Sequence, residues 1–322
     1  MNRSMVKFFE ELALCIRLTR YRESIYAMIV SQMDETSDAA GSGVFAVGGL
    51  MARGVAFFEL ERKWEKLLKR PDIDIPFFKA SDCKNGRGEF AKFVAVPGSP
   101  TEAEHQRLDE ISHEFLSLIP KEQYIIAHGI GVVQKDFYEV IEDENARAIL
   151  GSSPYRLAYD LAMIQCAWAM KQLEENIRSD KEKLMAIGPS YREHVCFVCD
   201  EDEEHSPLAH EAYRNLKLTN PNAAQYMAAF SSADDKEYAV LQAADAVVFE
   251  IRRVLNLVLG NYSRGVLRKQ FGILADPGKM FLITHTSKEQ LMAIVANHNP
   301  GEPFKLDEIM DKELTENVRF TI

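Results

Sequence analysis

The sequence has none of the long apolar runs that mark a membrane-spanning chain. Among its 322 residues, no stretch approaches the ~20 consecutive apolar residues that a transmembrane helix needs. The first stretch, 1–24, carries charges throughout and has no uninterrupted apolar core, which argues against a signal peptide. Its apolar positions recur at helical spacing, so we expect an amphipathic helical extension that docks on the protein, with surface membrane contact as the lesser alternative.

Cysteine is scarce, and the count of five is odd. Most of these cysteines have apolar neighbours, a pattern typical of buried thiols in a reducing compartment, so the sequence predicts a cytoplasmic protein. Cys196 and Cys199 have the spacing of a zinc or redox pair. They fall within an expected strand, however, where residues three apart point to opposite faces of the sheet. A zinc site is therefore disfavoured.

The sequence has fewer basic than acidic residues. It contains 38 Lys and Arg and 49 Asp and Glu, which gives a net charge of −11. A globally acidic protein binds nucleic acid poorly unless a local basic surface compensates. One such cluster lies near the last long helix expected and could attract a polyanion such as nucleic acid, although a solvated helix face explains it equally well. It consists of Arg252, Arg253, Arg264, Arg268 and Lys269. Nothing in the sequence predicts the oligomeric state.

What the sequence does contain is an alternation of strand-like and helix-like segments. Strands are expected over 25–33, 44–52, 123–133, 194–200 and 225–231, and helices over 57–70, 102–118, 154–176, 206–217 and 236–259. Thr101 and Glu104 have the spacing of a capping box for the second helix. Three early strands followed by alternating helices and strands predict an α/β fold, a mixed central sheet flanked by helices.

We expect three parts along the chain. Residues 1–24 form the helical extension, 25–285 form one α/β domain, and 286–322 form a C-terminal helix and tail. Within the α/β domain, a helical insertion near 53–120 separates the second strand from the third.

The first candidate for chemistry is Asp34-Glu35-Thr36, directly after the first expected strand. Strand ends in open α/β sheets commonly line ligand sites. A simple turn is the alternative, because Asp and Thr also begin turns.

The second candidate is Asp200, which ends a short apolar strand and opens a run of five carboxylates through Glu204. Neighbouring carboxylates repel each other, and a bound cation would relieve that repulsion. For Glu203 and Glu204, a solvated acidic loop is the alternative.

The third candidate pairs Gln242 with Asp245 inside an otherwise apolar helix. A lone carboxylate there carries a desolvation cost unless it is ion-paired or metal-bound. Arg252 lies on the same helical face, so a buried ion pair with Arg252 or Arg253 is the alternative.

These motifs together carry a resemblance to a known family. The Asp34-Glu35-Thr36 strand end, the helix with Trp64, the FFKASD stretch around Lys79 and the LQAAD stretch ending at Asp245 resemble domain-of-unknown-function family 3800. The resemblance covers about residues 25 to 260. It implies a ribonuclease H-like fold with a carboxylate site for a divalent metal. Thr36 stands where the family more often has Ser, and alanines flank Asp245 where a Leu often precedes it, which leaves the subfamily and substrate open.

In such a fold the ends of the first and fourth strands lie side by side and the last helix crosses them. We therefore expect Asp34, Asp200 and Asp245 to bind Mg²⁺ or Mn²⁺ and to support phosphodiester hydrolysis, as in a nuclease. Glu35 or Asp202 would be an outer ligand or a base.

Further residues are expected around these ligands. Lys79, Gln242 and Arg252 would contact the substrate. Lys79 could instead neutralise Asp82, and an ordinary surface lysine is the plain alternative. Asp160 is an additional candidate ligand, with an exposed helical position as its plain alternative.

Two other functions stay open. A non-catalytic binding or regulatory module could keep the fold and use its carboxylates as ion pairs. A hydrolase of a small phosphorylated metabolite would suit the acidic total, and a narrow pocket around the three aspartates would support it.

Overall fold

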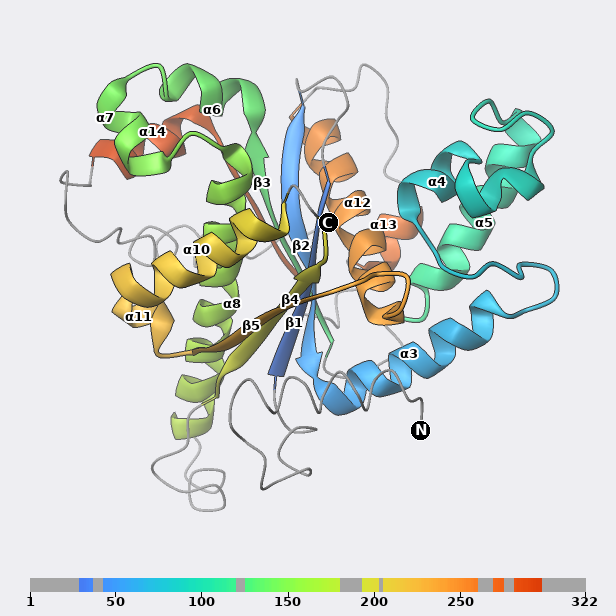
Figure 1. Ribbon diagram of the computed structural model, residues 1–322, viewed down its shortest axis with the longest axis horizontal. Coiled ribbons are helices and arrows are strands. Elements are labelled where there is room, and N and C mark those ends of the chain that lie inside the picture. The colour runs from blue at the N-terminus through green and yellow to red at the C-terminus, as the bar shows by residue number, and fades with distance from the viewer. Residues whose placement is uncertain are drawn as a thin grey trace.

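A computed structural model describes residues 29–36, 43–119, 125–179, 193–202, 205–259, 269–274 and 281–296, and arranges them around a six-stranded sheet (Figure 1). The strands lie in the order β5-β4-β1-β2-β3-β6. They are β1 (Ile29–Thr36), β2 (Val44–Arg53), β3 (Ile126–Val133), β4 (Val195–Asp200), β5 (Met227–Ala233) and β6 (Phe281–Thr286). β2 is antiparallel to β1 and β3, while the pairs β1–β4, β4–β5 and β3–β6 are parallel. The predicted mixed α/β sheet is confirmed.

Helices cover both faces of this sheet, and each face has its own apolar core (Figure 1). One face carries α3 (Gly54–Leu68), α4 (Ala80–Asn85), the 3-10 helix η1 (Gly88–Phe93), α5 (Glu102–Leu116), α12 (Ala239–Val258) and α13 (Lys269–Leu274). The other carries α6 (Gln134–Val140), α7 (Glu144–Leu150), α8 (Pro154–Ser179), α10 (Ser206–Thr219), α11 (Pro221–Ala224) and α14 (Lys288–Ala296). Because side chains alternate across a strand, Val30 joins the α12 face and Met33 the α8 face.

The contact between α12 and the sheet is unusually close at β2. A Cβ atom on Gly49 would lie 2.1 Å from the carbonyl oxygen of Gln32 and 2.9 Å from the Cβ of Ala244. Gly49 also has φ +151°, a value that side chains disfavour. Glycine therefore lets α12 approach the strands closely at Ala244, the residue directly before Asp245.

Most predicted elements are present with small shifts in their bounds. The Thr101–Glu104 capping box forms as expected, and the helical insertion comprises α3, α4, η1 and α5 between β2 and β3. Cys196 packs into the α12 face and Cys199 into the α8 face, which confirms their opposite orientation. The first strand differs, because it extends through Thr36 where the sequence analysis ended it at residue 33.

Some elements were not predicted, and some predictions fall outside the described residues. β6, α6 and α7 are additions to the expected pattern. The helix expected over 1–24, most of the tail, and Arg264 and Arg268 of the basic cluster lie outside the described residues. Within the described part of the chain, no helix combines the length and apolarity that crossing a bilayer requires.

Candidate carboxylate site

The ends of β1 and β4 deliver two aspartates to the α12 face of the sheet. Met33 pairs with Cys199 in the parallel register, so Asp34 and Asp200 follow as neighbours on adjacent strands. Asp245 reaches them from α12, and the charges of Asp200 and Asp245 both act on Asp34. The structure therefore brings together the three aspartates that the sequence analysis singled out.

Lys79 lies at the centre of this group. Its Nζ is 3.2 Å from Oδ2 of Asp235, 3.7 Å from Oδ2 of Asp34 and 3.8 Å from Oδ1 of Asp245. These distances correct two expected ion pairs, that of Lys79 with Asp82 and that of Asp245 with an arginine of its own helix. Lys79 neutralises these aspartates and not Asp82, and the ion-pair partner of Asp245 is Lys79 and not an arginine of its own helix.

Gln242 and Asp245 hold the segment that carries Lys79. Oε1 of Gln242 accepts the backbone N–H of Phe78 at 3.0 Å, and Oδ2 of Asp245 accepts that of Ala80 at 2.6 Å. The two acceptors are three residues apart on α12 and so share a face. They bind alternate N–H groups on either side of Lys79 and fix its backbone against the helix.

The amide of Gln242 is used entirely within the protein. Its Oε1 also accepts the indole N–H of Trp64 at 3.1 Å, and its Nε2 donates to the backbone oxygen of Asp235 at 2.8 Å. The residue is 1% exposed. These contacts give no support to the predicted role of Gln242 in binding substrate. They show that Gln242 holds the backbone of the segment that carries Lys79.

Burial and mutual repulsion disfavour the simultaneous ionisation of all these carboxyl groups beside one lysine. Burial raises the pKa of Asp34 well above its ordinary value and also raises that of Asp245, and Lys79 offsets these shifts only in part. Burial and the neighbouring Asp235 raise the pKa of Asp200 to about 6. Although burial opposes it, the surrounding carboxylates raise the pKa of Lys79 above its usual range. The lysine is therefore charged at neutral pH.

Asp235 is a site residue that the sequence analysis missed. Its backbone N–H donates to Oδ1 of Asp200 at 3.1 Å, and its carboxylate binds Lys79. It follows the end of β5, as Asp34 and Asp200 stand at the ends of β1 and β4. Its position shortly after an expected strand is the sequence signal that could have identified Asp235 as a site residue.

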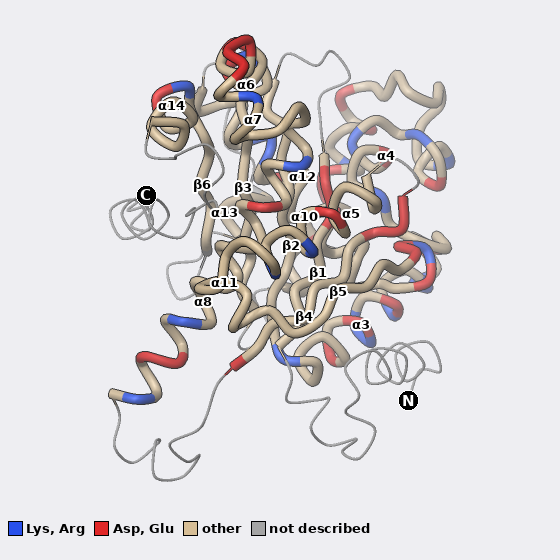
Figure 2. Tube along the Cα trace, turned by 60° about the vertical axis from the view of Figure 1, so that its left-hand side comes forward, with Lys and Arg blue, Asp and Glu red and all other residues tan. Residues whose placement is uncertain are grey.

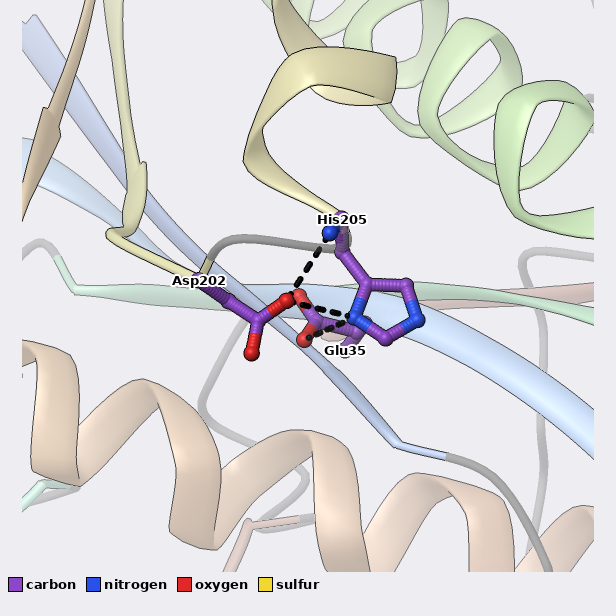
Figure 3. A group of neighbouring side chains, drawn as sticks. All are labelled: Glu35, Asp202 and His205. Carbon is purple, nitrogen blue, oxygen red and sulfur yellow. Dashed lines mark hydrogen bonds and ion pairs between the residues drawn. The ribbon is translucent and has the colours of Figure 1, made fainter.

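A second group of polar side chains lies on the other face of β1 (Figure 3). Nδ1 of His205 is 3.0 Å from Oδ1 of Asp202 and 3.5 Å from Oε1 of Glu35. Tyr159 of α8 donates to Oε2 of Glu35 at 2.6 Å, and the Tyr155 ring stacks on His205 with centroids 4.3 Å apart.

One imidazole and two carboxylates are a donor set that suits a transition-metal ion. The same contacts also serve the protein itself, because Asp202 accepts the backbone N–H of His205 at the start of α10. Glu35 and Asp202 thus belong to this group and not to the Lys79 cluster.

Two other predicted residues lie apart from both groups. Arg252 is 8% exposed, with its guanidinium 5.4 Å from the ring centroid of Phe249, and stands two turns, or about 10 Å, along α12 from Asp245. Asp160 is paired with Arg156 at 3.2 Å, and burial raises its pKa to about 7. Roles for Arg252 in substrate binding and for Asp160 as a ligand stay predictions.

The surface around the site carries both basic and acidic residues. Arg253 lies beside the same Phe249 ring, and acidic and basic residues share the neighbouring helix α3 (Figure 2). A pocket of about 430 Å³ beside α3 is lined by residues that include Lys69, Lys236 and Gln242, and by none of the three predicted aspartates. This pocket is therefore not the one that a small-metabolite hydrolase would need.

No family model, no curated protein and no solved structure matches the chain. The resemblance to domain-of-unknown-function family 3800 stays a prediction.

Proposed function

We propose that the chain is a divalent-metal-dependent phosphodiester hydrolase, nuclease-like in its chemistry, with Asp34, Asp200 and Asp245 as metal ligands. The observation that carries the proposal is an excess of buried negative charge. Three aspartates lie within 3.8 Å of one ammonium group and Asp200 acts on it through its charge, so full ionisation of the four would leave a net charge of −3. Burying unbalanced charge is costly, and a divalent cation would remove most of the excess.

The donor atoms fit such a cation. Asp34 is 2% exposed, and its Oδ2 has no hydrogen-bond donor in the structure. A buried carboxylate oxygen without a donor is rare and requires an explanation. Carboxylate oxygens are the ligands that Mg²⁺ and Mn²⁺ prefer, which makes these ions the expected occupants.

The arrangement of the sheet supports the same proposal. The run β5-β4-β1-β2-β3, with β2 antiparallel between β1 and β3, is the order that we expect of a ribonuclease H-like core, and β6 extends it beside β3. The carboxylates stand at the ends of β1 and β4 with α12 across them, as that fold would require.

The reaction needs few groups from the protein. Hydrolysis forms a bond between a water oxygen and phosphorus and breaks the bond to the leaving oxygen, which takes up a proton from solvent. Bound divalent ions would supply the activation of water and the stabilisation of the leaving oxygen. Asp34, Asp200 and Asp245 would hold the ligand positions on the α12 face, and the proton of the attacking water passes to solvent, because Glu35 and Asp202 contact His205 on the opposite face.

Calorimetric titration with Mn²⁺ tests the metal site directly. We expect wild-type protein to bind Mn²⁺ and Asp34→Asn and Asp245→Asn each to weaken binding by at least ~10-fold. Glu61→Gln is the matched control, because Glu61 is also a buried carboxylate with a raised pKa but lies on α3 outside the cluster. The proposal fails if wild type binds no Mn²⁺, or if both aspartate variants bind as tightly as wild type. Positive binding would justify assays on DNA, RNA and a simple phosphodiester.

A second candidate is a non-catalytic binding or regulatory module, favoured by the contacts of Lys79 with three carboxylates. In that case the cluster is a structural ion-pair network. Removing one partner of a buried pair then costs about 3–5 kcal/mol of stability. Urea unfolding of Asp245→Asn without metal, set beside its phosphodiesterase activity, separates the candidates. An enzyme loses activity while it stays folded, whereas the module loses stability and has no activity to lose.

A further inference from the structure

We propose that Lys79 is a tethered counter-ion, whose ammonium group occupies the cation site in the metal-free chain and yields it to a divalent metal. Once displaced, the ammonium group is available to bind the phosphate of the substrate. This inference rests on the proposed metal site. It adds that the ammonium group of Lys79 competes with the metal for the carboxylate oxygens.

The oxygens that Lys79 contacts are the ones left available for a metal. In Asp34, Oδ1 accepts the backbone N–H of Glu35 at 2.8 Å, and Oδ2 faces Lys79. In Asp245, Oδ2 accepts the N–H of Ala80 at 2.6 Å, and Oδ1 faces Lys79. Each carboxylate thus has one oxygen fixed by the backbone and one directed at the ammonium. A metal that binds the second pair of oxygens must take the space of Nζ.

The lysine can leave this position without disturbing its backbone. Hydrogen bonds from Phe78 to Gln242 and from Ala80 to Asp245 hold the segment against α12. The Lys79 side chain is 32% exposed, so its flexible four-carbon stem has a route to solvent. The ammonium can therefore move outward while the aspartates and the helix stay in place.

The consequence is a competition between two cations for the same oxygens. The ammonium balances one of the four carboxylates, and its removal leaves the full negative charge to attract a metal. A displaced lysine remains attached beside the site, where its positive charge favours an anionic ligand such as a phosphate. Lys79 thus couples metal binding to the attraction of substrate.

The test compares Mn²⁺ affinity of full-length wild type, Lys79→Met and Lys236→Met by calorimetry. Methionine keeps much of the length of lysine and removes its charge. Lys236 is the matched control, because it is exposed directly after Asp235 and lies over the Phe77 ring, 5.9 Å from its centroid. We expect Lys79→Met to bind Mn²⁺ at least ~10-fold tighter, since the ammonium competes at close range in a buried site, and Lys236→Met to match wild type. If folded Lys79→Met binds Mn²⁺ only as tightly as wild type or more weakly, the inference is wrong. The proposed function is then still supported, provided that wild type binds Mn²⁺.

A measurement on wild-type protein covers the case in which Lys79→Met does not fold. Acetylation by an amine-reactive ester, mapped by mass spectrometry, reports how accessible each lysine is. We expect saturating Mn²⁺ to increase the modification rate of Lys79 several-fold relative to protein in EDTA and to leave Lys236 unchanged. An unchanged rate at Lys79 despite calorimetric Mn²⁺ binding would refute displacement. Absence of Mn²⁺ binding by wild type removes both this inference and the proposed function.

Discussion

At the scale of single residues, position along the chain identified some site residues and could not identify others. Asp34 and Asp200 were predictable because each stands at the end of an apolar strand, and Asp245 because it lies inside an apolar helix, where a lone carboxylate is costly. Lys79 and His205 carry no such local signal. Their roles arise from contacts across long sequence separations, such as the 156 residues between Lys79 and Asp235. Only the fold reveals these pairings.

His128 shows how a buried polar group makes stability depend on pH. It is 0% exposed, its Nε2 lies 2.9 Å from the Ser31 hydroxyl, and burial lowers its pKa to about 4. The unfolded chain, with a histidine pKa of ~6.5, therefore binds more protons than the folded chain below that pH. The stability that neutral His128 contributes is complete above pH ~6.5 and is lost as pH falls towards 4.

We therefore expect wild type to lose unfolding free energy between pH 7 and pH 4 relative to His128→Gln, which cannot take up this proton. A fully buried histidine with this shift accounts for about 3 kcal/mol over that range. Urea unfolding of both proteins at a series of pH values measures the difference. Parallel curves would show that His128 does not titrate on unfolding.

At the scale of elements, the sequence predicted the strands and helices that have clear apolar patterns and boundaries. The capping box fixed the start of α5, and apolar runs marked β2 and β4. β6 was missed because its six residues include His and Thr, and its partner β3 lies about 150 residues earlier in the chain. Parallel pairing over such a separation leaves no signature in a local pattern.

Gly49 tests the close approach of α12 to the sheet. Gly49→Ala should destabilise the protein by roughly 3 kcal/mol or more, because the new Cβ would meet the Gln32 carbonyl oxygen at 2.1 Å as well as adopt an unfavourable φ. Gly151→Ala is the control for backbone strain alone, since Gly151 has φ +79° with nothing within 4 Å of its Cβ position. Its cost should be about 1–2 kcal/mol. Equal losses in thermal unfolding would show that crowding at Gly49 is unimportant.

At the scale of the whole molecule, the alternation of elements was sufficient to predict an α/β sheet with helices on both faces. It did not predict how charge is distributed. A net charge of −11 describes the chain, whereas the cluster around Lys79 concentrates four carboxylates at one edge of the sheet. That concentration results from strand order and the path of α12. Composition contains no information about either.

Metal binding should be measurable as stability of the entire fold. An ion that binds only the folded protein stabilises it by about 2.7 kcal/mol at one hundred times its dissociation constant. We expect Mn²⁺ at that concentration to raise the unfolding free energy of wild type by this amount and that of Asp34→Asn by about 1.4 kcal/mol or less, because a variant that binds at least ~10-fold more weakly is then at no more than about ten times its own dissociation constant. Chemical denaturation with and without Mn²⁺ provides the measurement, and an equal gain in both proteins would place the ion elsewhere.

The placement of Asp34 and Glu35 as consecutive residues of β1 has a consequence for how this gene can change. The two side chains serve opposite faces of the sheet, one beside Lys79 and the other beside His205. Deleting or inserting one codon in β1 before Asp34 would exchange the faces of both carboxylates, because side-chain orientation has a period of two. A change of two codons would restore the faces and alter only the length of the strand. Natural length variation in β1 should therefore occur in steps of two residues.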